Sequence, residues 1–187
     1  MKGKKLILSL LFLVLAINLF SQKQNRKNII GFGVGISPAK QIWIGNPANF
    51  WADINSGTII QLFYERQVLE ALRLGSYFEY ESTKFASTND KASRYNVGVN
   101  WIAQYPKNDL HLQLGGYFGY GTLAANNWDQ SVSGIDYGII IGPAYENNNF
   151  GIAVHLQTGF GYYLSSGVPD EVDFSIPRFV LKVYYKL

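Results

Sequence analysis

Two histidines stand in a repeated triplet, His111-Leu112-Gln113 and His155-Leu156-Gln157, and imidazole nitrogens can bind metals or carry protons. A zinc site needs at least three protein ligands, and no motif in the chain supplies a third one. Buried polar groups need hydrogen-bond partners. The triplets therefore predict a structural hydrogen-bond network, with no metal and no cofactor.

Three alternating glycines, Gly31, Gly33 and Gly35, resemble the start of a nucleotide-binding loop. The next required glycine is missing, and Pro38 stands where a helix should begin. A strand with one face of small residues fits better. The chain has no cysteine, which excludes disulfides, a thiol nucleophile and cysteine-ligated metal.

In the segments that carry these residues, apolar and more polar side chains alternate with a period of two residues. In the last segment, Phe179, Leu181 and Val183 alternate with Val180 and Lys182. Such alternation is typical of a strand with two different faces. Eight segments show it, and they begin at Ile30, Ile60, Leu72, Tyr95, Leu110, Ile135, Phe150 and Phe179. Each is long enough for the roughly 9 to 11 residues that a tilted membrane strand requires.

The gaps between these segments alternate between short and long. Residues 66–70, 106–109 and 146–149 form short gaps, whereas 37–56, 82–93, 122–132 and 164–175 form long ones. Membrane barrels have short periplasmic turns and longer outer loops. We therefore expect both termini on the periplasmic side and four outer loops.

The first long gap contains three large aromatic residues, Trp43, Phe50 and Trp51. Exposed aromatic residues on a rigid scaffold suit contact with an extracellular partner or glycan. Packing against the barrel rim or the lipid headgroups is the alternative.

The polar phase of the strands is expected to face the inside of a barrel. If it faced lipid, Arg73 and Lys182 could each cost roughly 2 to 4 kcal/mol near the bilayer midplane. Turned inward, the two cations can pair with Glu65, Glu79 or Asp136. The predicted interior network consists of Gln61, Glu65, Arg73, Glu79, Asn96, Asn100, His111, Gln113, Asp136, His155, Gln157 and Lys182.

The N-terminus has the pattern of a secretory signal peptide. A basic start, Met1 to Lys5, precedes an apolar run from Leu6 to Phe20, and Ser21 offers a small residue for cleavage. The run is shorter than the roughly 20 residues that span a bilayer. We expect residues 1–21 to be cleaved and residues 22–187 to form one barrel domain. Removing three of the sixteen basic residues leaves thirteen, which equals the thirteen acidic ones, so nucleic acid is not an expected partner.

Aromatic residues lie near the segment ends, as in the interfacial girdles of membrane barrels: Tyr64, Tyr80, Tyr95, Tyr105, Tyr120, Tyr145, Tyr162 and Tyr185. With the alternating strands, they make the chain from about Asn28 to Leu187 resemble the small eight-stranded outer-membrane barrels of the OmpA and OmpX kind. The chain departs from that group by ending in Leu187 instead of phenylalanine. The resemblance implies an all-β fold, a closed antiparallel eight-stranded transmembrane β-barrel in the outer membrane of a Gram-negative bacterium. Its partners would be outer-membrane lipid and the outer-membrane assembly machinery.

Such a barrel, with its lumen filled by side chains, is expected to be non-enzymatic and to serve membrane integrity or surface interaction through its outer loops. A narrow pore or transport channel is the first alternative. A lipid-modifying enzyme is the second, because related small barrels that cut or transfer acyl chains use His and Ser near the outer rim. Here Ser165 and Ser166 lie at that level, but both histidines start low on their strands. Nucleophile and base are therefore separated, and we predict no catalytic residues.

Overall fold

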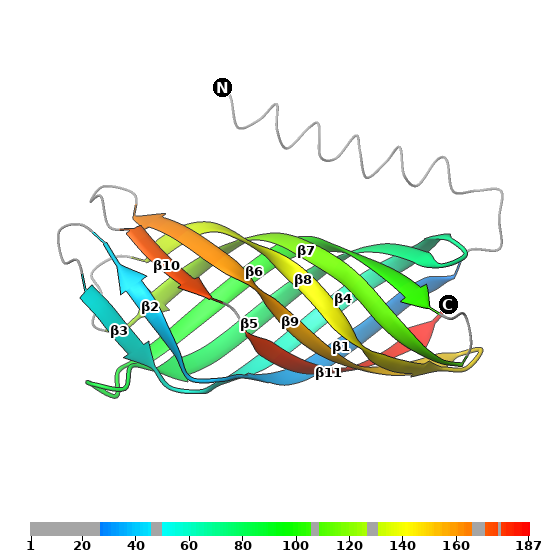
Figure 1. Cartoon of the computed structure of the whole chain (residues 1–187), viewed down its shortest axis with the longest axis horizontal. Coiled ribbons are helices and arrows are strands. Elements are labelled where there is room, and N and C mark those ends of the chain that lie inside the picture. The colour runs from blue at the N-terminus through cyan, green and yellow to red at the C-terminus, as the bar shows by residue number, and fades with distance from the viewer. Residues whose placement is uncertain (1–26, 46–49, 106–108, 127–130, 166–170, 176) are drawn as a thin grey trace, which may run out of the picture.

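The computed structural model describes residues 27–45, 50–105, 109–126, 131–165, 171–175 and 177–187 (Figure 1). The predicted signal peptide, residues 1–21, lies outside this part of the chain. No helix within the described ranges is long and apolar enough to cross a membrane.

Eight long antiparallel strands form the wall of a closed barrel. They are β1 (Asn28–Ser37), β4 (Gly57–Leu69), β5 (Leu72–Lys84), β6 (Lys91–Tyr105), β7 (Leu110–Ala125), β8 (Val132–Glu146), β9 (Phe150–Ser165) and β11 (Arg178–Lys186). The last strand, β11, pairs with both β1 and β9, so the sheet closes on itself. Closure leaves these strands without a free edge. The predicted closed eight-stranded antiparallel barrel is confirmed.

The alternation of residue types along each strand matches which side chains face out of the barrel and which face into it. Along β6, Tyr95, Val97 and Val99 are exposed, whereas Asn96 and Asn100 between them are buried. The same holds around the wall, so an apolar surface faces outward and a largely polar set of side chains faces inward. Membrane barrels have this arrangement, with apolar side chains toward the lipid and polar side chains toward the lumen.

Three short strands extend the wall at one end. They are β2 (Lys40–Ile44), β3 (Phe50–Ile54) and β10 (Glu171–Ser175). The order β9-β10-β2-β3 continues the sheet, and Figure 1 shows these strands at the end opposite to the C-terminus. We call this the far end, and the end that carries Asn28 and Leu187 the terminal end.

The short strands overturn part of the sequence prediction. Residues 37–56 and 164–175 were expected to be outer loops, but each contains a β-strand that pairs with neighbouring strands. Strands of five residues show too little alternation to be recognised. Two prolines, Pro38 and Pro177, also separate β2 from β1 and β10 from β11, and proline cannot donate a ladder hydrogen bond.

Candidate functional site in the barrel interior

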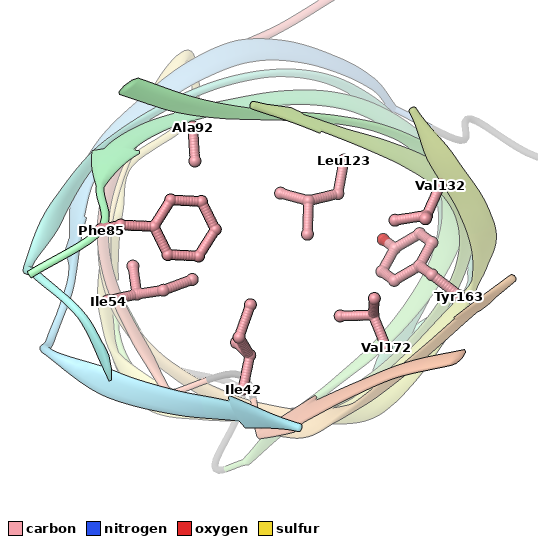
Figure 2. Packing of buried hydrophobic residues seen from close by; sticks show 8 residues of the cluster. All are labelled: Ile42, Ile54, Phe85, Ala92, Leu123, Val132, Tyr163 and Val172. Atoms are coloured by element: carbon pink, nitrogen blue, oxygen red, sulfur yellow. The ribbon is translucent and has the colours of Figure 1, made fainter. Parts of the chain in front are cut away.

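Eight apolar side chains gather inside the barrel at the far end, and we call them the apolar plug. Figure 2 shows eight side chains that point from the wall toward the middle of the ring: Ile42, Ile54, Phe85, Ala92, Leu123, Val132, Tyr163 and Val172. All eight are at most 5% exposed. Three of them come from the short strands, so the same segments that were expected to be loops supply part of the plug. The sequence had suggested an interior that is polar along its whole length. The structure shows instead that the far end of the interior is apolar.

A cluster of charged side chains lies beneath this plug. We call it the far cluster, and it consists of Lys40, Glu79, Glu81, Arg94, Asp136 and Arg178. Three cations face three carboxylates, so the cluster has no formal net charge. A buried ion is tolerated when it is paired and hydrogen-bonded in this way.

Arg94 is at the centre of the far cluster. Its Nη2 lies 2.5 Å from Oε1 of Glu79, its Nε lies 3.0 Å from Oε2 of Glu81, and its Nη1 binds Oδ2 of Asp136. These contacts join strands β5, β6 and β8 across the interior. The guanidinium group suits this position because its rigid fork presents donors in several directions at once.

The other two cations complete the pairing. Nη1 of Arg178 lies 2.6 Å from Oε1 of Glu79, and Nζ of Lys40 lies 2.9 Å from Oε1 of Glu81. Lys40 belongs to β2, outside the eight long strands. Burial lowers the pKa of Lys40 from its usual value, while the charge of Glu81 opposes this change.

Aromatic side chains fill the interior below the far cluster. The rings of Tyr77 and Tyr117 meet edge to face at 6.4 Å, and the guanidinium carbon of Arg178 lies 5.3 Å from the centre of the Tyr117 ring. Glycines provide the space: a Cβ atom on Gly98 would lie 2.6 Å from the Tyr77 hydroxyl oxygen, and one on Gly119 would lie 2.7 Å from it. Side chains at these two positions would displace Tyr77.

A second polar cluster occupies the terminal end. We call it the terminal cluster, and it consists of Glu65, Arg73, Asn100, Gln104, His111, Gln113, Glu146, His155, Lys182, Tyr184 and Lys186. Glu146 makes more of these contacts than any other member of the cluster. Its Oε2 lies 2.5 Å from Nη2 of Arg73 and 2.5 Å from Nζ of Lys186, while the Tyr184 hydroxyl donates to its Oε1.

Lys182 contacts a different carboxylate in the terminal cluster. Its Nζ lies 3.4 Å from Oε1 of Glu65, one of the three carboxylates that the sequence offered as partners. Nδ2 of Asn100 donates to the same oxygen at 3.0 Å. The ammonium group also lies 4.2 Å from the centre of the Phe63 ring, which favours a cation.

The pairing of Arg73 differs from the prediction. Its partner is Glu146, whereas Glu79 and Asp136 bind Arg94 and Arg178 in the far cluster. Arg73 lies near the terminal end of β5, and Glu79 lies six residues farther along the same strand, toward the far end. The position of Arg73 along the barrel axis therefore determines which carboxylate it can reach.

The two histidines lie on either side of one glutamine. Nε2 of His155 is 2.7 Å from Oε1 of Gln113, and Nε2 of His111 is 3.2 Å from Nε2 of the same side chain. Within the described part of the chain, no three His, Asp or Glu side chains are grouped so that they could hold a metal ion. The imidazoles thus take part in an interior hydrogen-bond network.

Comparison with known proteins identifies the architecture. The sequence matches no protein-family model and no curated protein. Among solved structures, Neisserial surface protein A is similar at a TM-score of 0.58 and 13% identity, over 88% of this chain and 100% of that one. The outer membrane protein OprG from Pseudomonas aeruginosa is similar at a TM-score of 0.55 and 13% identity, over 86% of this chain and 95% of that one. This chain has the fold of the small eight-stranded outer-membrane barrels.

In this outer-membrane barrel fold, the twelve residues of the predicted interior network are all buried, each at most 6% exposed. Among the described residues, the prediction missed seven buried polar ones: Ser37, Glu81, Thr83, Arg94, Gln104, Glu146 and Arg178. The sequence contained a signal for them, because each continues the inward-facing alternation of its strand toward the strand end. The strands had been taken as shorter than they are.

The predicted contact residues of the first outer loop lie on the barrel wall. Trp43 is on β2 and Trp51 is opposite it on β3, with ring centres 5.2 Å apart. Phe50 begins β3, and its side chain lies outside the described structure, as do the side chain of Ser165 and the whole of Ser166. At its far end the barrel thus presents the paired strands β2 and β3 where an outer loop was expected.

Proposed function

We propose that this chain is an outer-membrane barrel sealed by its own side chains, which acts through its surfaces and not through a pore. The observation that carries the proposal is the filled interior: an apolar plug, two ion-paired clusters and a layer of tyrosines follow one another along the barrel axis. An eight-stranded barrel is only just wide enough for side chains to fill it.

The packing of the far cluster supports the sealed state. The cavity beside Lys40, Glu81 and Arg94 has a volume of about 10 Å³, which is room for about one water molecule. An ion that passes here must separate buried ion pairs, each of which is held by further hydrogen bonds. A narrow pore is therefore the weaker alternative.

A role in surface interaction is supported by the far end. Trp51 is 61% exposed, and its ring meets that of Trp43 on a hairpin whose inner face packs into the plug. A large aromatic residue on a rigid support loses little conformational entropy on binding. The proposed role combines structural support of the membrane with contact through this hairpin.

Two features of the barrel ends support an orientation in the membrane. The backbone N–H of Leu187 donates to the carbonyl oxygen of Asn28 at 2.7 Å, so both ends of the described wall lie together. The short connections of the wall lie at the same end, as periplasmic turns do in membrane barrels. We propose that the terminal end faces the periplasm and the far end faces the cell exterior.

Membrane fractionation tests this location. We expect the mature chain in the outer-membrane fraction, beginning near Gln22, with migration on gels that changes when the sample is heated, because a closed barrel resists detergent until it is boiled. Recovery in the inner membrane with Met1 retained would contradict both the cleaved signal peptide and the proposed location.

A further inference from the structure

Two unpaired lysines lie opposite each other on the outward face of the far end. Lys84 on β5 and Lys91 on β6 are direct cross-strand neighbours, and both are exposed. Neither forms an ion pair or a side-chain hydrogen bond with any residue in the described ranges. Of the lysines and arginines in those ranges, the only other exposed one is Lys27, which lies at the terminal end.

This pair is unfavourable for the isolated barrel. Like charges directly opposite each other destabilise a β-ladder. The nearby carboxylates in the described ranges do not compensate: Asp90 forms no ion pair with either lysine, and Asp53 accepts a hydrogen bond from Gln41 at 2.9 Å. The two ammonium groups therefore attract an anion from outside the chain.

The outward residues beneath the lysines form an ordered series. Ser82 pairs with Ser93, then Tyr80 with Tyr95, whose ring centres are 5.0 Å apart, and then Phe78 with Val97. The hydroxyl groups of Tyr80 and Ser93 lie 3.3 Å apart. Hydrocarbon, interface and headgroup regions of a membrane prefer apolar, aromatic and charged side chains in this same order.

We propose that Lys84 and Lys91 bind the phosphate of an anionic lipid in the leaflet at the far end. The Cβ atoms of opposite residues are roughly 4.5 to 5.5 Å apart, so two lysine side chains can contact one phosphate group. The serine hydroxyls lie one residue pair below, at the level of the glycerol, and the tyrosine pair flanks the upper acyl chains. This inference rests on the proposed membrane location.

Native mass spectrometry of the full chain, folded in detergent, tests the site. The probes are phosphatidylglycerol, a diacylglycerol with the same acyl chains but no phosphate, and inorganic phosphate. We expect the double variant Lys84→Gln, Lys91→Gln to bind phosphatidylglycerol roughly tenfold more weakly or worse, since each basic residue adds to the attraction. The control variant Lys27→Gln should bind as the native chain does.

A charge reversal provides a second variant. Lys84→Glu places a carboxylate opposite Lys91 and removes the like-charge repulsion. We expect it to keep the heat-dependent gel migration of a folded barrel while losing phosphatidylglycerol binding.

Three results would overturn the proposal: unchanged phosphatidylglycerol binding by the double variant, equally tight binding of the diacylglycerol by the native chain, or displacement of phosphatidylglycerol by equimolar inorganic phosphate. Each can occur in a barrel that fractionates with the outer membrane, so failure here is distinguishable from failure of the proposed location.

Discussion

Replacing Arg94 by leucine is expected to destabilise the barrel more than any other single change that we consider. The substitution leaves Glu79, Glu81 and Asp136 buried with two cations among them in place of three. Breaking a buried ion pair by removing one partner costs about 3 to 5 kcal/mol, because the remaining charge is uncompensated. Denaturant unfolding of the protein in lipid vesicles, followed by tryptophan fluorescence, measures this loss.

The control for Arg94→Leu is Lys27→Gln, because Lys27 is an exposed cation at the terminal end whose substitution should affect the unfolding free energy by less than about 0.5 kcal/mol. Adding Asp136→Leu to Arg94→Leu restores the balance of charge in the cluster, and the double variant should lose less than the sum of the two single variants. An Arg94→Leu barrel as stable as the native one would show that the far cluster is not formed.

Placing an arginine on the outward face is expected to have the second-largest effect. Val154 lies in the central part of β9 and is 48% exposed, whereas Leu110 is the first residue of β7 and is 68% exposed. A lipid-facing arginine costs about 2 to 4 kcal/mol at the bilayer midplane and about 0 to 1 kcal/mol near the interfaces. Val154→Arg should therefore reduce the free energy of folding into vesicles by about 2 to 4 kcal/mol.

Leu110→Arg is the matched control, since it adds the same side chain to an outward position at the end of a strand. Its cost should be about 1 kcal/mol or less. Equal losses for the two variants would mean that the exposed apolar surface does not face hydrocarbon, which removes the physical basis of the membrane assignment.

The strands and their faces could be predicted from the sequence because the alternation is local. The residue types of Val97 and Asn96 alone indicate that their side chains lie on opposite faces of the strand. Once the sheet closes, the polar face lies inside the barrel. The strands β2, β3 and β10 could not be predicted in this way. They are short, and they are ordered by pairing with one another and with β9, at large separation in the sequence.

The interior contacts could be predicted as a set but not as pairs. Arg73 on β5 meets Glu146 on β8, and Arg94 on β6 meets Glu79 on β5. Which side chains share a level depends on the tilt and stagger of the strands, and these properties belong to the closed barrel as a whole. The residue types alone therefore could not show that Arg73 pairs with Glu146 and that Glu79 pairs with Arg94.

Conductance of the purified, refolded protein in a planar lipid bilayer tests the sealed barrel most directly. The packed interior predicts a quiet membrane, with no wide, stable open level at moderate voltage, under conditions in which gel migration shows that the barrel is folded. A large and steady single-channel current from the unmutated protein would contradict the sealed barrel and establish the pore in its place.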